Sequence, residues 1–200
     1  MLANTTRLVL ATALAAGGTL AMQAPASAAK SCLLGKWKLT QFTMTAKGEN
    51  IDVTGQGAEG MRLTVGKNSV TYNFTKAKKL VTTGTEAGKP LTVETQYKKS
   101  LTMKSSFKGT KTGTLTLKPK TASGSATGTV SFGGKKTPAY KLAKKYRGGE
   151  YEPIAVPVSA FDCSGKTKKT KKATATLKIT YTISDPNGTA VGTLSFKRSS

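Results

Sequence analysis

The chain of 200 residues has no histidine and only two cysteines, and these absences exclude much of the chemistry that enzymes use. Histidine is the usual general base near neutral pH and the commonest zinc ligand. Without it, the familiar catalytic triads and most zinc and iron sites are excluded. We therefore expect no enzymatic activity, no catalytic residue, no metal site and no cofactor.

Acidic residues are also scarce: nine Asp and Glu stand against 32 Lys and Arg, for a formal net charge of +23. Glu150 and Glu152 lie two residues apart in a segment expected to be extended, so they share a face. Paired carboxylates are the catalytic groups of most glycosidases. Beside Arg147, however, we interpret them as ordinary surface carboxylates.

The first 28 residues have the pattern of a signal peptide. Arg7 precedes an apolar run from Leu8 to about Met22, and Ala26-Ser27-Ala28 fits the small-residue rule for cleavage. The run is too short to span a membrane comfortably, and no later stretch is apolar for long enough. We predict a secreted or envelope-associated protein that does not span the membrane, with a signal peptide at 1–28 and one domain at 29–200.

Cys32 and Cys163 are predicted to form one disulfide, because two cysteines in an exported protein usually pair. A lipid anchor on Cys32 is the alternative. The residues before it, Ala29-Lys30-Ser31, do not suit lipidation, and Cys32 lies far from the apolar run.

Alternation of apolar and polar residues predicts short β-strands through most of the chain. We expect a first hairpin from Met61–Val65 and Val70–Phe74, and the same pattern recurs in Leu91–Tyr97 and Leu101–Phe107. We also expect pairing between Thr112–Lys118 and Thr127–Phe132, and a last hairpin from Lys172–Ser184 and Thr189–Lys197. Regular spacing of short strands indicates an all-β barrel or sandwich.

Three other segments have different patterns. Residues 45–60 are polar and glycine-rich and are expected to form a flexible loop. Thr137–Arg147 is the one predicted helix, with Pro138 in its first turn and Gly148-Gly149 after its end. Tyr151–Cys163 contains Pro153 and Pro157 and is expected to be an edge strand or a loop.

The only tryptophan, Trp37, lies in the stretch Leu33–Leu39, within the step Gly35-Lys36-Trp37. This stretch resembles the first-strand motif of lipocalins and fatty-acid-binding proteins. The resemblance implies a single antiparallel up-and-down β-barrel of about eight to ten strands with one short helix, the alternative being a β-sandwich. It also implies that an arginine near the end of the last strand, here Arg198, packs over the tryptophan.

The chain departs from that family at several points. The nearest match to the second lipocalin motif, Thr-Asp-Tyr, is Thr95-Gln96-Tyr97, and it lies early in the chain. Arg198 is followed by Ser199-Ser200, so the Arg-x-Tyr carboxylate clamp of fatty-acid-binding proteins is missing.

The resemblance implies a non-enzymatic protein that holds a small hydrophobic or amphipathic ligand inside the barrel. The residues expected to point inward, and so to line such a ligand or to fill a solid core, are Trp37, Leu39, Leu63, Val65, Tyr72, Phe74, Val93, Tyr97, Met103 and Phe107. Small barrels commonly fill their interior with side chains, so both interpretations stand.

Clustered lysines indicate an alternative function, in which a basic protein associates with an anionic cell-envelope polymer and the barrel is only a scaffold. The strongest candidate patch contains Lys166, Lys168, Lys169, Lys171 and Lys172. Few aromatic residues lie among the lysines, so no specific nucleic acid is expected. The same clusters equally suit a solvated surface that keeps the protein monomeric.

Overall fold

The computed structural model describes residues 31–163, 175–186 and 188–199, which form an all-β protein with one short helix. Eight strands close into an antiparallel barrel, as predicted. These strands are β1 (Gly35–Gly48), β3 (Arg62–Val65), β4 (Ser69–Asn73), β7 (Ser100–Lys108), β8 (Thr112–Gly124), β12 (Val158–Asp162), β13 (Thr176–Asp185) and β14 (Gly188–Arg198).

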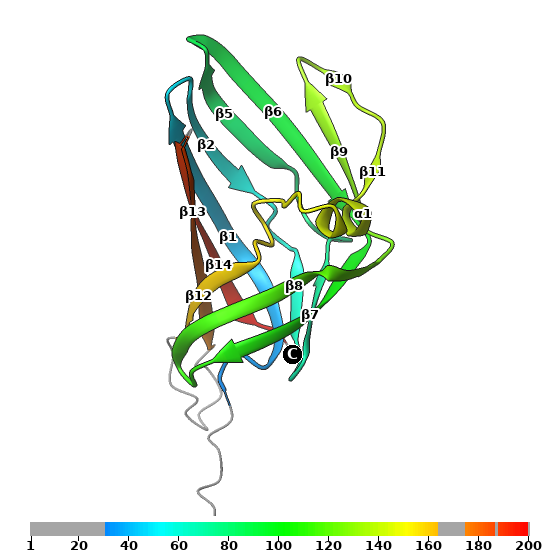
Figure 1. Cartoon of the computed structure of the whole chain (residues 1–200). Helices are drawn as coiled ribbons and strands as arrows, with labels where there is room; N and C mark the ends of the chain where they lie inside the picture. Colours follow the sequence, from blue (N-terminus) through cyan, green and yellow to red (C-terminus); the bar gives the residue numbers. More distant parts are fainter. Residues whose placement is uncertain (1–30, 164–174, 187, 200) are drawn as a thin grey trace, which may run out of the picture.

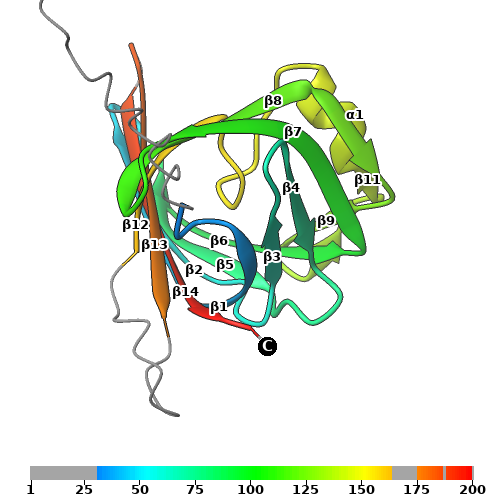
Figure 2. The same ribbon diagram turned by 90° about the horizontal axis from the view of Figure 1, so that it is seen from below.

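Around the ring, each barrel strand pairs with the barrel strands that precede and follow it in the chain, which is the up-and-down order. The ring closes where β14 returns to β1, with Trp37 opposite Arg198 and Gly48 opposite Gly188. This pairing of the last strand with the Trp37 strand closes the predicted barrel. Figure 2 looks into the ring from below.

The remaining strands extend the barrel at its upper end in Figure 1. They are β2 (Ile51–Gly57), β5 (Leu80–Glu86), β6 (Lys89–Lys98), β9 (Thr127–Phe132), β10 (Lys135–Lys136) and β11 (Tyr140–Lys141). β2 pairs with the upper half of β1, whose lower half pairs with β3, and the order continues as β2-β5-β6-β9. We call β13, β14, β1, β2, β5, β6 and β9, in this order, the upper sheet.

Two sequence-based expectations about pairing are wrong. β6 pairs with β5 and β9 while β7 pairs with β4 and β8, so these two do not form a hairpin. β8 likewise pairs with β7 and β12 and not with β9. The chain bends at Lys99 (φ +64°), between β6 and β7, and at Gly124 (φ +107°), the last residue of β8. Each bend carries the chain from the barrel ring to the upper sheet or back.

The expectation of a loop at 45–60 is also wrong, because most of this segment forms a hairpin. β1 runs to Gly48 and β2 starts at Ile51, and β14 and β5 flank the two strands. The bend that follows needs a glycine: at Gly57 (φ +123°) an added Cβ would lie 2.1 Å from the carbonyl oxygen of Lys79.

The helix α1 (Leu142–Arg147) is shorter than the predicted Thr137–Arg147. Its expected first residues pair with β9 instead: Tyr140 lies opposite Gly128, and the Thr137 amide donates to the Val130 carbonyl. Strand pairing supplies hydrogen-bond partners to backbone N–H groups that would have none in the first turn of a helix. The helix ends at Arg147 and is followed by Gly148, as predicted.

The segment between α1 and β12 enters the barrel and fills it. Ile154, Ala155 and Val156 are at most 4% exposed, and Figure 2 shows this segment (yellow) looping into the ring. We call residues 149–157 the plug. The edge-strand or loop expectation is wrong for β12, which lies between β8 and β13. Apolar side chains at 154–156 favour the interior over solvent.

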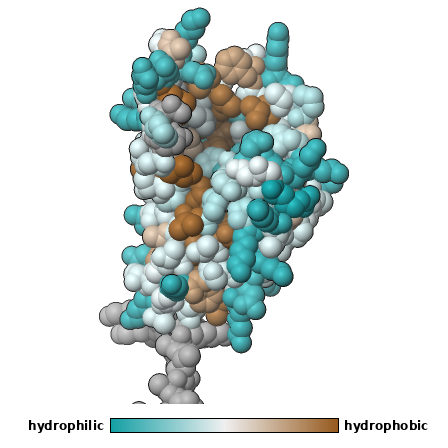
Figure 3. Space-filling model, in the orientation of Figure 1, coloured by the Kyte–Doolittle hydropathy of each residue, from teal (hydrophilic) through white to brown (hydrophobic). Residues whose placement is uncertain are grey.

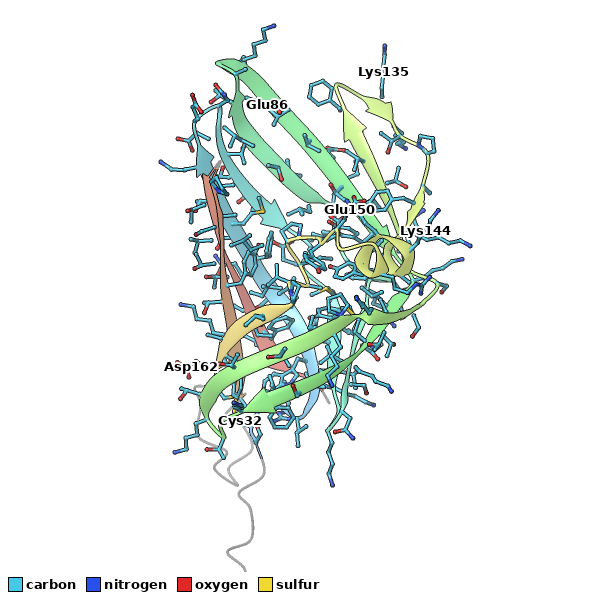
Figure 4. All side chains as sticks on the ribbon, in the orientation of Figure 1. Cys32, Glu86, Lys135, Lys144, Glu150 and Asp162 are labelled. Atoms are coloured by element: carbon cyan, nitrogen blue, oxygen red, sulfur yellow. A yellow bond between two sulfur atoms is a disulfide. The ribbon has the colours of Figure 1, made fainter. Side chains whose placement is uncertain are left out.

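The predicted disulfide between Cys32 and Cys163 is confirmed. It joins the lead-in of β1 to the end of β12, and Figure 4 labels Cys32 at the lower end of the molecule. The Cys32 and Cys163 amides also donate to the carbonyls of Thr110 and Lys111, both at 2.9 Å. The disulfide thus lies against the β7–β8 turn, at the lower end of β1, β12 and β14.

Candidate functional site

Trp37 seals the lower end of the barrel. Its ring is fully buried, and its indole N–H donates to the Leu33 carbonyl at 2.9 Å. The Arg198 guanidinium lies 4.3 Å from the ring centroid and donates to the carbonyls of Leu34 and Cys32. The expected packing of Arg198 over Trp37 is thus present. Gly35 makes room for it, because a Cβ there would collide with the Arg198 guanidinium.

Most of the residues expected to line a ligand are packed in the core. Eight of them are at most 3% exposed: Trp37, Leu39, Leu63, Val65, Tyr72, Phe74, Tyr97 and Met103. Phe107 packs against the same core and is half-buried. Beside the plug, a space of only about 10 Å³ separates Tyr72, Ile154 and Phe196, which is too small for an organic ligand. Val93 is half-buried and lies on the inner face of β6, four residues before the buried Tyr97.

A buried carboxylate in the plug forms hydrogen bonds to residues of β6, β11 and α1. Glu152 is 7% exposed and accepts hydrogen bonds from Tyr97 (2.7 Å), Tyr140 (3.0 Å) and Lys145 (2.9 Å). The interpretation of Glu150 and Glu152 as a pair of surface carboxylates is wrong for Glu152. Glu150 is exposed and lies 3.8 Å from Lys145. With three donors on one carboxylate, this cluster acts as a structural latch.

Burial also raises the pKa of the latch tyrosines. Desolvation, followed by the nearby Glu152 charge, raises the pKa of Tyr97 and of Tyr140 above the ordinary value of 10. Desolvation likewise raises the pKa of Tyr146. These phenols therefore stay protonated as donors throughout the neutral range.

A pH dependence follows from these shifts. Above about pH 10 the unfolded chain releases phenolic protons that the folded chain retains, so the free energy of unfolding should fall as pH rises further. Five of the six tyrosines, Tyr72, Tyr97, Tyr140, Tyr146 and Tyr181, have raised pKa values. Spectrophotometric titration should show these five ionising only as the protein unfolds. Reversible ionisation of all six near pH 10 in folded protein would contradict their burial.

The inner face of the upper sheet presents two rows of mostly small and apolar residues. Each row runs across the strands and joins residues that lie opposite one another in the strand pairing. From β13 onward, the lower row contains Tyr181, Gly192, Met44, Gly55, Thr82, Val93 and Phe132, and the upper row contains Ile183, Ala190, Ala46, Val53, Gly84 and Leu91. We call these two rows, together with Ile51 above them, the trough. None of these residues is charged.

The outer face of the same strands differs sharply. Between the two inner rows, the residues that point outward are Thr182, Val191, Thr45, Thr54, Thr83 and Thr92. A sheet with one hydroxyl-rich face and one apolar face normally buries the apolar face against a second layer. In the trough, only part of that face is covered.

Large apolar side chains in the trough remain exposed. Ile51, Ile183 and Phe132 are 36%, 43% and 56% exposed. A hollow of about 180 Å³ lies between Ala46, Ile51, Ile183 and Ala190, and Lys47, Gly188 and Thr189 complete its lining. Figure 3 shows apolar surface running down this side of the molecule and hollowed near the top, and Figure 4 labels Glu86 and Lys135 at the upper rim. The trough is open to solvent from the side and from above.

Two features of the trough floor stand out. The Tyr181 ring lies over Gly192, where an added Cβ would be 2.1 Å from a ring carbon. The Tyr181 hydroxyl is buried and has no hydrogen-bond partner among the residues that the structure describes. A buried donor without an acceptor is uncommon and calls for an explanation.

Sequence reasoning missed most of the trough. Residues 45–60, expected to be a loop, supply Ala46, Ile51, Val53 and Gly55 to it. Tyr181 and Ile183 belong to the predicted strand Lys172–Ser184, in which apolar and polar residues alternate, but alternation does not say which face lacks a cover. The lysine patch from Lys166 to Lys172 lies outside the described residues.

The fold defines the class: an eight-stranded, closed, up-and-down antiparallel barrel with a plugged interior and an open, apolar upper sheet. Within the described residues, no helix is long and apolar enough to cross a membrane, and no group of three or more potential ligand residues is placed to hold a metal ion. No protein-family model, curated protein or solved structure matches the chain.

Proposed function

We propose that the protein is an exported, non-enzymatic binding protein that holds a small apolar or amphipathic molecule in the trough. One observation carries the proposal: the two rows of the trough contain no charged side chain, and the trough keeps Ile51, Ile183 and Phe132 exposed to water. Glu86 and Lys89 follow on the same face only at the rim, in the row of Ile51. Exposed apolar surface of this kind typically marks a ligand-binding groove or an interface. The solid barrel core favours the trough over the barrel interior as the site.

The buried, unpaired Tyr181 hydroxyl supports an amphipathic ligand whose hydrogen-bond acceptor it would meet after a shift of the Tyr181 ring. Pockets for small molecules combine mostly apolar walls with a few polar groups that orient the ligand. Tyr181 and Thr82 are the hydroxyl-bearing residues of the two rows, and both lie in the lower one. The acceptor of the ligand would face the trough floor.

A relationship to lipocalin-like proteins is part of this proposal. Its support is the up-and-down order of the eight barrel strands, the Gly35-Lys36-Trp37 step and the guanidinium of Arg198 over Trp37. The proposed ligand position differs from the interior site that the resemblance implies, because the plug fills the barrel. Export rests on the signal-peptide pattern at 1–28, outside the described residues.

Native mass spectrometry of the mature protein, purified from its host's medium, tests whether a ligand is held. A discrete added mass of a few hundred daltons that is lost on denaturation is the expected result. Protein that carries no added mass, and that also fails to bind a neutral fluorescent probe such as N-phenyl-1-naphthylamine, would overturn the proposal.

A matched pair of variants locates the site. Ile183 points into the trough and Val191 points outward from the neighbouring strand, with almost equal exposure of 43% and 44%. Ile183→Lys should weaken binding of N-phenyl-1-naphthylamine by about 10-fold, since a charge in an apolar site carries a desolvation penalty. Val191→Lys should change it less than about 2-fold. Equal losses in both variants would exclude the trough.

The second candidate function, association with an anionic envelope polymer, is supported by the formal charge of +23. Charge of this size attracts polyanions at long range and loses that attraction as salt rises. Retention of the protein on envelopes at low salt, and its release at high salt, is the expected result.

A further inference from the structure

A second concavity lies on the outer face of β6 and β9. It has a volume of about 390 Å³, and its lining consists only of polar and charged residues: Lys79, Glu94, Gln96, Lys98, Thr129, Ser131 and Lys136. We call it the outer groove. Its lysines come from three separate places, namely the approach to β5, the end of β6 and the β9–β10 hairpin.

The balance of charge in the outer groove is positive. Lys79 and Glu94 form an ion pair at 2.6 Å and offset each other. Lys98 and Lys136 are exposed, and neither has an ion-pair partner within the described ranges. Two uncompensated ammonium groups therefore face one concavity, and a third is held by a single exposed carboxylate.

Hydrogen-bonding groups lie between these cations. Thr129 and Ser131 point outward from β9, and their side chains make no hydrogen bond to any described residue. The Gln96 amide donates to the carbonyls of Ala77 and Tyr97, so its nitrogen is held in place. The outer groove thus offers hydroxyl donors between point charges, a combination suited to the oxygens of a phosphate chain.

We propose that the outer groove binds a flexible, non-aromatic polyanion of the polyphosphate or polyol-phosphodiester class. It contains no aromatic residue for base stacking and no arginine for bidentate contact. Lysines supply charge without fixed geometry, which suits a repeating chain of phosphates better than a defined small ligand. Single-stranded nucleic acid is the competing class.

The outer groove and the trough lie on opposite faces of the same strands. Val93 and Phe132 point inward while Glu94 and Ser131, their immediate neighbours in the chain, point outward. The two sites are separated by the thickness of one sheet, so each can be disrupted alone. Ile183→Lys should leave polyanion binding intact, which separates the failure of one proposal from the failure of the other.

The test measures the affinity for inorganic polyphosphate as a function of salt. The triple variant Lys79→Gln/Lys98→Gln/Lys136→Gln should weaken binding by about 10-fold or more near 0.1 M salt and reduce the salt slope by about 2. The control Lys36→Gln/Lys38→Gln/Lys197→Gln removes the same charge from exposed positions on β1 and β14. It should lose less than about 3-fold.

Two outcomes would overturn the proposal. Equal losses in the two triple variants would mean that total charge, and not the outer groove, determines binding. Tighter binding of oligothymidylate than of polyphosphate with the same number of phosphates would point to nucleic acid instead. Thermal unfolding of each variant tests whether it is folded. Every variant should be folded, because substitution of an exposed lysine costs little stability.

Discussion

Replacing both cysteines, in Cys32→Ser/Cys163→Ser, should lower the free energy of unfolding by about 5 kcal/mol in the chain-entropy model. The disulfide spans 131 residues and so removes many conformations from the unfolded chain. The folded state should change little, because the amides of both residues are already held by the β7–β8 turn. Urea unfolding of the variant and of the oxidised wild type measures the difference.

Wild-type protein with its disulfide reduced is the matched control, and it should lose a similar amount of stability. The ordinary net stability of a domain is about 5–15 kcal/mol, so we expect the variant to be only marginally folded at 37 °C. An unchanged urea midpoint in the variant would contradict the entropic argument. It would mean that the unfolded chain is already restricted between residues 32 and 163.

Trp37→Ala should cost about 3–5 kcal/mol of unfolding free energy, the range found when large buried aromatic residues are truncated. The fully buried ring is lost, and the Arg198 guanidinium loses the surface on which it stacks. Phe132→Ala is a matched control, because that ring is 56% exposed. It should cost about 1 kcal/mol or less.

A double-mutant cycle with Arg198→Met isolates the contact between guanidinium and indole. We expect a coupling of about 1–2 kcal/mol, as for a partly desolvated cation–π pair. A loss of less than about 1 kcal/mol in Trp37→Ala would show that the lower end of the barrel tolerates a cavity. That result would mean that Trp37 is not the residue that holds the barrel closed.

Local patterns in the sequence were enough to predict several features. Alternation through Met61–Val65 and Val70–Phe74 matches the observed β3–β4 hairpin, because a period of two is a property of the strand itself. The disulfide followed from the count of cysteines and the export signal. The place of Arg198 over Trp37 followed from a resemblance in one short stretch.

Other features depend on contacts between residues far apart in the chain. Nothing near Glu152 in the sequence marks it as buried; its partner Tyr97 lies 55 residues away. The bend at Lys99, a lysine with positive φ, sends β6 and β7 to different partners, although few residues other than glycine adopt that conformation.

The sequence by itself thus determined the β class, the disulfide and the closure of the last strand onto the Trp37 strand. Only the tertiary structure decided that the plug fills the barrel and that the trough stays open. The physical reason is that alternation assigns residues such as Val93 and Ile183 to a face of a strand, whereas burial depends on what other segments pack against that face. The candidate site is therefore a property of the assembled sheet.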